Sequence, residues 1–335
     1  SKGINAKLYQ YEFRSYLNEN TLTYQFNKNR HSMNALAGLS LQKNSDYAHS
    51  VATEHISNES FGMAGLDKGT NQTIESNQGE NKMMSYFGRI NYNFDSRYYI
   101  TASMRADGSS KFPKNNRWGY FPSGSVAWAF GREAFISENA SWLSNGKLRI
   151  SYGQTGNNRV GDFDYMAKLI TSDDVYKYPW NSSFTPGFHI SNKANSQLKW
   201  ETTDQYNVGL DMGFWNNRIS LSANYYYKKT NDLLQNVSIP NSTGYTTMWT
   251  NFGHVKNKGL ELTGKIIALD KKDWTLDFDG NISFNKNEIG GLTADQYANQ
   301  LWYSAKEVFL QRNGLPIGTL FGYIEDGFYD NIAEV

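Results

Sequence analysis

The stretch GLDMGFWNNRISLSANYYY, residues 209–227, decides the fold of this chain. Apolar side chains at Leu210, Met212 and Phe214 alternate with small or polar ones, and the same alternation resumes from Ile219 after the pair of asparagines. Two runs of period two separated by turn residues are typical of an antiparallel β-hairpin with one apolar and one polar face. The stretch therefore predicts two paired strands.

The same period of two recurs along most of the chain, and a period of 3.6 is almost never seen. Turn-forming residues separate the successive runs, as at Asp95-Ser96-Arg97. Ten strands are predicted, near residues 15–27, 32–42, 84–94, 98–107, 118–130, 147–155, 199–214, 219–229, 253–269 and 274–286.

The connections between these strands alternate in length. Short ones are expected at 28–31, 95–97, 215–218 and 270–273, with a moderate helix-like one at 131–146. Long ones are expected at 43–83, 108–117, 156–198, 230–252 and from 287 onward. Tight turns on one side and long loops on the other are typical of an up-and-down transmembrane β-barrel, whose tilted strands cross the bilayer in about ten residues.

A soluble β-sandwich or barrel explains the alternation of side chains equally well, so that pattern alone leaves the two classes open. The segregation of loop lengths favours the membrane barrel, because a sandwich has no reason to sort its loops by side. In a barrel the sheet closes on itself and satisfies its backbone groups in lipid, and aromatic-rich strand ends form interfacial girdles.

The composition excludes several classes of protein. Lys and Arg number 33 against 32 Asp and Glu, a formal charge of +1, so no nucleic-acid partner is expected. There is no cysteine, and no apolar run approaches the length of a transmembrane helix. The 51 aromatic residues and 29 glycines favour strands and turns. A mean hydropathy of −0.65 is compatible with a barrel, because every second residue of a strand faces a polar lumen.

No pattern of residues predicts an enzyme. The five histidines lie far apart without metal-ligand spacing, and no nucleotide-binding or hydrolase motif is present. Asp162 and Asp164 lack the spacing of a calcium loop, so no metal and no cofactor are expected. A glycoside hydrolase would need two loop carboxylates at catalytic separation, for example Asp162 and Asp326. The sequence thus predicts no catalytic residues.

Aromatic residues in the long loops are the candidate substrate-binding residues. Aromatic faces in polar loops stack on sugars and grip peptides, although they equally serve to pack loops against each other or against a partner. The candidates are Tyr176, Tyr178, Trp180, Phe184, Tyr245, Trp249, Trp302 and Tyr303.

A series of short motifs occurs in order over residues 84–330. They are YFGRINY (86–92), RADGSSKF (105–112), WGYFPSGS (118–125), WLSN (142–145), KLR (147–149), SYGQTGN (151–157), LKWETT (198–203), YYYKKTNDLL (225–234), NKGLEL (257–262), NGLPIG (313–318) and FGY (321–323). In order and spacing these motifs resemble the SusC/RagA family of TonB-dependent outer-membrane transporters.

The resemblance implies a plugged barrel of roughly 22 strands in the outer membrane of a Gram-negative, Bacteroidota-type cell. Such a transporter imports nutrients such as oligosaccharides or oligopeptides. Its expected partners are a SusD-like lipoprotein that closes over it as a lid, the TonB energising complex, the surrounding outer-membrane lipid and the glycan or peptide substrate.

Residues 1–335 are expected to form the middle of that barrel, about ten of its strands. The signal peptide, the plug, the TonB-contacting segment and the C-terminal strands are expected to lie outside this chain. The alternative is a soluble or surface carbohydrate-binding β protein. Such a protein would bury Leu210, Met212, Ile219 and Leu221 under a second sheet.

Overall fold

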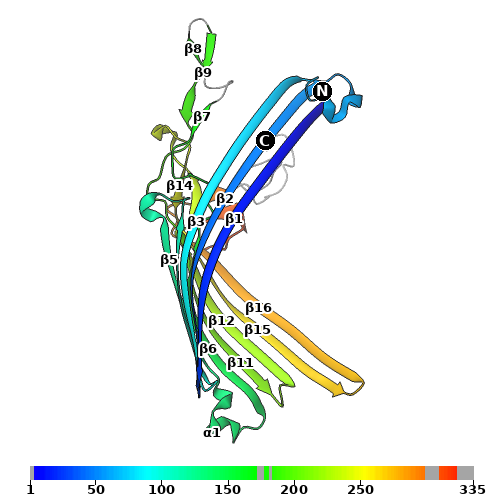
Figure 1. Cartoon of the computed structure of the whole chain (residues 1–335), viewed down its shortest axis with the longest axis vertical. Helices are drawn as coiled ribbons and strands as arrows, with labels where there is room; N and C mark the ends of the chain where they lie inside the picture. Colours follow the sequence, from blue (N-terminus) through cyan, green and yellow to red (C-terminus); the bar gives the residue numbers. More distant parts are fainter. Residues whose placement is uncertain (1–3, 172–176, 181–182, 299–308, 323–335) are drawn as a thin grey trace, which may run out of the picture. The chain divides into compact units, whose positions relative to one another are not determined.

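The computed structural model describes residues 4–171, 177–180, 183–298 and 309–322 (Figure 1). Ten strands form one sheet in the order β1-β2-β3-β4-β5-β6-β11-β12-β15-β16, and each corresponds to one predicted strand. These strands are β1 (Ile4–Lys28), β2 (His31–Ile56), β3 (Thr70–Phe94), β4 (Tyr98–Ser109), β5 (Trp118–Trp128), β6 (Leu143–Asn157), β11 (Glu201–Phe214), β12 (Ile219–Asn231), β15 (His254–Lys271) and β16 (Trp274–Gly290).

The chain divides into two compact units. Unit 1 comprises Ser1–Gly124, Thr155–Trp200 and Leu234–Asn251, and unit 2 comprises Ser125–Gln154, Glu201–Leu233 and Phe252–Val335. β1 to β4 belong to unit 1, whereas β11, β12, β15 and β16 belong to unit 2.

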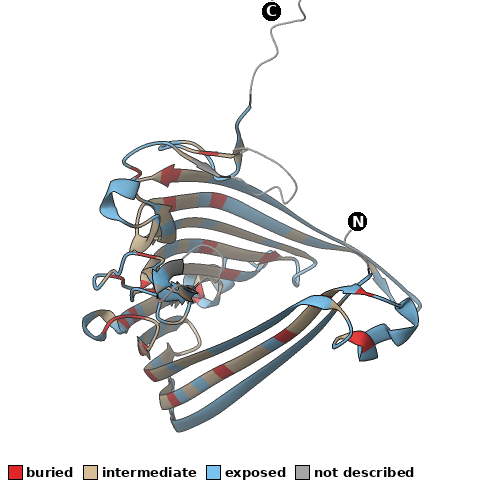
Figure 2. Cartoon of the chain, turned by 90° about the horizontal axis from the view of Figure 1, so that it is seen from above, coloured by how far each residue is buried: buried red, intermediate tan, exposed pale blue. Residues whose placement is uncertain are grey.

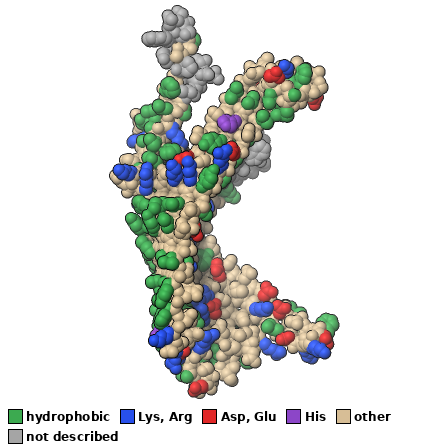
Figure 3. Space-filling view, in the orientation of Figure 1, with side chains coloured by type: hydrophobic (Ala, Val, Ile, Leu, Met, Phe, Trp, Pro, Cys, Tyr) green, Lys and Arg blue, Asp and Glu red, His purple; other side chains and the backbone are tan. Residues whose placement is uncertain are grey.

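In unit 1 the register of the strands separates an apolar face from a polar one. Ala35 of β2 lies opposite Ile90 of β3, and Ile90 lies opposite Ala102 of β4. The next residues along, Leu36, Arg89 and Ser103, are paired in the same way and point to the other face. The predicted alternation is therefore matched across neighbouring strands, and one face of unit 1 is apolar (Figure 3).

Aromatic rings bound this apolar face at both ends. Phe94 contacts His31 and Tyr98 at the end with the tight turns, with ring centroids 5.0 and 6.4 Å apart. Tyr86 stacks on Trp118 at the other end, at 5.9 Å. The interval from Tyr86 to Phe94 is about 26 Å along the strand at ~3.3 Å per residue, comparable with the ~25 Å apolar band of outer-membrane barrels. These rings are in the positions of two interfacial girdles.

Unit 2 repeats the pattern. One row of paired residues contains Leu210, Ala223, Leu262 and Ile282, and the adjacent row contains Asp211, Ser222, Thr263 and Asn281. The hairpin predicted from residues 209–227 is present, with Phe214 opposite Ile219 across its turn.

The apolar face of unit 2 is open to its surroundings. Leu221 is 44% exposed and Ile282 is 52% exposed, while Leu210, Met212 and Ile219 are half-buried. A soluble sandwich would bury these side chains, whereas a barrel presents them to lipid. The exposure therefore favours the membrane barrel over the soluble alternative.

The long connection predicted at 43–83 is wrong. β2 continues to Ile56, a 3-10 helix occupies Glu59–Gly65, and β3 begins at Thr70, so most of this segment is strand (Figure 1). The extension was missed because it carries polar residues on both faces, for example Ser45 opposite Glu80 and Asn44 opposite Asn81. This part of β2 and β3 therefore lacks a continuous apolar side that would produce a period of two.

The other connections contain short elements. The segment at 131–146 contains 3-10 helix η3 (Phe130–Arg132) and α1 (Ala134–Ser137), which is only one turn. Further 3-10 turns are η2 (Lys114–Asn116) and η4 (Asn241–Thr243). Short strands are β7 (Leu169–Thr171), β8 (Lys177–Trp180), β9 (Ser183–Pro186), β10 (Phe188–Ile190), β13 (Leu234–Ser238), β14 (Thr247–Asn251), β17 (Gln296–Ala298), β18 (Phe309–Gln311) and β19 (Thr319–Leu320). Among the described residues, no helix is long and apolar enough to cross a membrane.

Buried apolar residues gather at the strand ends and loops, and buried positions along the strands are isolated (Figure 2). The core of unit 1 contains Phe112, Phe121, Val160, Leu198 and Trp200. That of unit 2 contains Val255, Ile289 and Leu292. The cores therefore anchor the loops, while the long strands keep both faces available.

Candidate functional site

The buried cluster of unit 1 fixes the long loops. Phe112 and Leu198 are fully buried, and the ring of Trp200 lies 5.2 Å from Phe112 and 5.5 Å from Phe121. A Cβ at Gly156 would lie 2.0 Å from the Phe121 ring, so glycine is needed for this approach. The cluster holds the segment before β5 against the segment before β11.

Two of the predicted substrate-binding aromatics, Tyr245 and Trp249, lie in the connection between β12 and β15. Trp249 is on β14, half-buried, and packs against the unit 1 cluster. Its carbonyl oxygen accepts a hydrogen bond from Asn195 Nδ2 at 2.8 Å. Tyr245 is half-buried just after η4, and its carbonyl oxygen lies 3.4 Å from the Thr243 hydroxyl. Trp249 therefore contributes to the packing of one loop on another.

The predicted aromatics of the 156–198 loop include one plainly accessible ring. Phe184 is on β9 and is 73% exposed. The backbones of Tyr178 and Trp180 lie in β8, opposite Thr185 and Ser183. Tyr176, Trp302 and Tyr303 lie outside the described residues, as does Asp326. The β8–β9 hairpin thus carries three of the eight candidates.

Polar side chains on the strands form a second candidate surface, which the sequence did not single out. In unit 2, Arg149 on β6 binds Asp211 on β11 through two hydrogen bonds, Nε to Oδ2 at 2.7 Å and Nη2 to Oδ1 at 2.8 Å. Arg149 also donates to Asn224 Oδ1 at 3.0 Å, and Ser222 donates to Asp211 Oδ1 at 2.8 Å. These residues occupy the polar face, opposite the row that contains Leu210.

Unit 1 has a comparable cluster on its polar face. Arg105 on β4 donates from Nε to both carboxylate oxygens of Asp107, each at 2.8 Å, and from Nη2 to Ser85 Oγ at 3.0 Å. Its guanidinium carbon lies 5.5 Å from the centre of the Phe87 ring, within the range of a cation–π contact. A Cβ at Gly38 would lie 2.2 Å from that ring, so the glycine makes room for Phe87.

These clusters suit binding rather than bond cleavage. Their donors and acceptors are paired with each other, and an Arg–carboxylate pair presents both charges to a polar solute. Asp162 lies 3.8 Å from Lys111 Nζ and 3.4 Å from Asn81 Nδ2. Within the part of the chain that the structure describes, no group of three or more His, Asp or Glu side chains is arranged to hold a metal ion. The arrangement offers charged and amide groups along a polar wall.

Comparison with known proteins gives one consistent family. Residues 3–327 match the family described as "TonB dependent receptor-like, beta-barrel". The chain is 34% identical over 323 residues to TonB-dependent receptor P3 of Formosa agariphila, covering 93% of this chain and 31% of that protein. It is 37% identical over 253 residues to TonB-dependent receptor SusC of Bacteroides thetaiotaomicron, covering 74% of this chain and 25% of that protein.

A solved structure shares the fold over nearly the whole chain. The RagAB peptide transporter matches with a TM-score of 0.80 and 28% identity, over 93% of this chain and 34% of that chain. The chain spans about a quarter to a third of the length of the relatives it matches.

Proposed function

This chain belongs to the TonB-dependent receptor β-barrel family, and we propose that it forms part of the wall of an outer-membrane nutrient importer. The family places the chain in the outer membrane, as a segment of a SusC/RagA-type barrel. Its relatives are named as receptors and transporters, not as enzymes, and the proposed mechanism breaks no bond.

The observation that carries this proposal is the two-faced strand pattern. In each unit one face is apolar and exposed, and the other holds hydrogen-bonded charges such as Arg105 with Asp107 and Arg149 with Asp211. Outer-membrane barrels have an apolar lipid face and a polar interior along which solutes pass. We place the polar face of each unit in the transport path.

The proposed substrate class is a polar oligomer, either an oligosaccharide or an oligopeptide. One matching structure is described as a peptide transporter, which supports the peptide alternative. Exposed loop aromatics such as Phe184 support either alternative, because an aromatic face stacks on sugar rings and on peptide side chains alike. The proposed partners are a SusD-like lipoprotein lid over the loops, and TonB acting through a part of the protein outside this chain.

Uptake by the full-length transporter tests the proposal. A strain that depends on this transporter is supplied with one oligosaccharide or one oligopeptide as the limiting nutrient. We expect Phe184→Ala to raise the concentration needed for half-maximal uptake by roughly three- to tenfold, since a lost aromatic contact is worth about 0.5–1.5 kcal/mol. The substrate that shows the shift identifies the class.

Phe135→Ala is the matched control, because Phe135 is 63% exposed but lies on α1, in the connection between β5 and β6 rather than in a long loop. Its uptake should equal that of the unsubstituted transporter. If deletion of the transporter leaves uptake of every oligomer unchanged, the import function is wrong. If Phe184→Ala alone is without effect, the aromatic site is wrong and the import function stands.

A further inference from the structure

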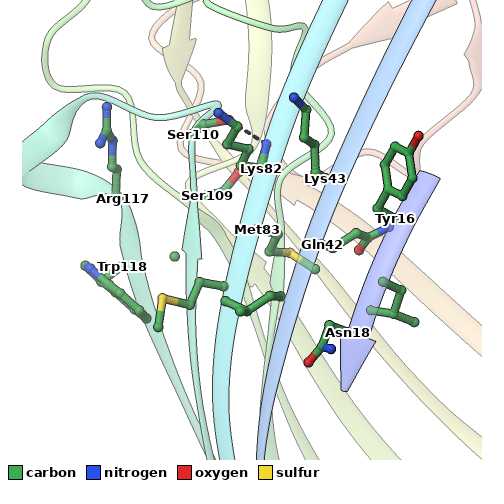
Figure 4. Close-up of a pocket in the computed structure, with 14 residues that line it drawn as sticks. Tyr16, Asn18, Gln42, Lys43, Lys82, Met83, Ser109, Ser110, Arg117 and Trp118 are labelled. Atoms are coloured by element: carbon green, nitrogen blue, oxygen red, sulfur yellow. Dashed lines mark hydrogen bonds between the residues drawn. The ribbon is translucent and has the colours of Figure 1, made fainter. Parts of the chain in front are cut away.

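A groove of about 800 Å³ crosses the apolar face of unit 1 at its loop end (Figure 4). It runs over β1 to β4 and the start of β5. Its apolar lining includes Leu41, Met84 and Trp118, and Gly108 leaves room beside the indole. Leu41, Met84 and Gly108 form one row of paired residues on the same face as Ile90, so the groove opens toward lipid.

Cations line the loop end of this groove. Lys43, Lys82 and Arg117 all belong to its lining, and Lys43 and Lys82 are direct cross-strand partners. Glu80 lies between the two ammonium groups, 2.8 Å from Lys43 Nζ and 2.9 Å from Lys82 Nζ. Two like charges opposed on neighbouring strands repel each other, and one carboxylate cannot neutralise three cations. A net positive charge therefore remains at this point.

The position of the groove fixes the depth of these cations in the membrane. They lie just beyond the girdle formed by Tyr86 and Trp118, on the side where long connections join the strands. In bacterial barrels the long loops face the cell exterior. The cations are therefore level with the headgroups of the outer leaflet, with apolar residues directly beneath them.

A second groove of about 560 Å³ lies on the same face, nearer the tight turns. It is formed where small residues, among them Ala35, Gly88 and Ala102, leave a depression between Tyr24, Ile90 and Met104. One row of paired residues, with Leu39 and Tyr86, separates the rows that line the two grooves. A second apolar depression thus lies below the cationic groove on the same face, where the acyl chains of a lipid with a charged headgroup would run.

We propose that this surface binds a phosphorylated glycolipid of the outer leaflet, with phosphate at Lys43, Lys82 and Arg117 and acyl chains along the apolar rows. Guanidinium and ammonium groups are the protein groups that bind phosphate most strongly. Asn18 and Trp118 in the same lining suit the hydroxyl groups and ring faces of a sugar. A phospholipid headgroup without sugar would leave these groups unused.

Binding of lipid A to the purified full-length transporter in detergent, followed by native mass spectrometry, tests the proposal. Phosphorylated lipid A should bind to the unsubstituted protein. The triple variant K43Q/K82Q/R117Q should lose on the order of a hundredfold in affinity, at about 1 kcal/mol for each cation removed. Glu80→Gln should tighten binding by roughly fivefold, because it removes the competing carboxylate.

The triple variant should bind lipid A more weakly, and Glu80→Gln more tightly. Because an unfolded variant does not bind more tightly, the two results together separate recognition from misfolding. Lys28→Gln is the matched control, because Lys28 ends β1 on the tight-turn side and should leave binding unchanged. Equal binding of dephosphorylated lipid A, or unchanged binding by the triple variant, would overturn the proposal. Equal affinity for phosphatidylglycerol would overturn the assignment to a glycolipid. The assay involves no transport, so its failure would leave the import function standing.

Discussion

Trp200 donates its indole N–H to the carbonyl oxygen of Arg117, at a distance of 2.8 Å. This bond joins the residue before β5 to the residue before β11, which are far apart in the sequence. It occurs within the unit 1 cluster, where Trp200 is only 7% exposed. One side chain therefore fixes the start of two distant strands.

Substitutions at Trp200 should loosen the loops without unfolding the strands. Trp200→Phe should lower the local stability by about 0.5–1.5 kcal/mol through the lost hydrogen bond, and Trp200→Ala by about 3–5 kcal/mol through the lost packing. Amide hydrogen exchange over residues 110–121 measures the effect. Trp215→Phe, at an exposed turn, is the control. Unchanged exchange in Trp200→Ala would show that the cluster does not hold this loop.

The two faces of β15 should differ in how much the same substitution destabilises the barrel. Leu262→Arg places a charge in the middle of the apolar row and should destabilise the barrel by about 2–4 kcal/mol in a bilayer. Thr263→Arg, one residue along on the polar face, should change stability by only about 0.5 kcal/mol. Urea unfolding of the full-length protein in lipid vesicles compares them. Equal costs would mean that the faces are assigned wrongly.

The Arg149–Asp211 pair should show measurable coupling. Both side chains are roughly one third exposed, at 36% and 28%, so solvent screens their attraction. Arg149→Gln and Asp211→Asn should each destabilise by about 1.5 kcal/mol, and the double variant by about 1 kcal/mol less than their sum. A double-mutant cycle on unfolding free energies measures this coupling. Additive effects would show that the pair contributes nothing as a pair.

Arg312 should set the titration of Asp295 in the last described loop. Arg312 donates to Asp295 from Nε at 2.9 Å, and this hydrogen bond lowers the pKa of the carboxyl below its usual 3.8. A lowered pKa means that the pair stabilises the loop fully above the usual value and less as the pH falls through the lowered one. Carbon-13 NMR of labelled Asp should show the Asp295 pKa rising in Arg312→Gln. Asp295→Asn identifies the signal, and an unshifted midpoint would contradict the pairing.

The strands that face lipid could be predicted from the sequence. One face of each strand lies in lipid and the other faces a polar interior, and this difference imposes a period of two on the side chains. Ile90 and Leu262 mark such positions. The strand extensions could not be predicted, since Ser45 and Glu80 stand outside the lipid where either face tolerates polar residues. The short pairing of β13 with β14 was missed for a related reason, because five residues are too few to show a period.

The candidate site was less accessible to sequence reasoning than the fold. Trp249 and Phe184 are both loop aromatics, yet one packs on a buried cluster and the other is exposed, which depends on tertiary contacts alone. The Arg149–Asp211 and Lys43–Lys82–Glu80 groups were also missed. Arg149 is distant in sequence from Asp211, and Lys43 from Glu80 and Lys82, so only strand register brings them together. The sequence offered one signal for these groups, namely charged residues that recur within strands whose side chains otherwise alternate between apolar and polar.

The extensions of β1, β2 and β3 beyond the lipid have a consequence for the order of folding. A slip of one residue inside the lipid band would turn every apolar side chain into the lumen. Above Lys43 both faces of the strands lie outside the lipid, so the same slip would only exchange residues such as Tyr11 and Glu12 between two aqueous faces. The side chains of the extensions therefore do little to specify the register of their own pairing. The pairing of β1 with β2 is continuous from Lys28 and His31 to Ala6 and Thr53, so the membrane part sets the register of the extension. The hairpin should close at its tight turn first and zip outward, so that the bilayer determines the shape of a surface that lies wholly outside it.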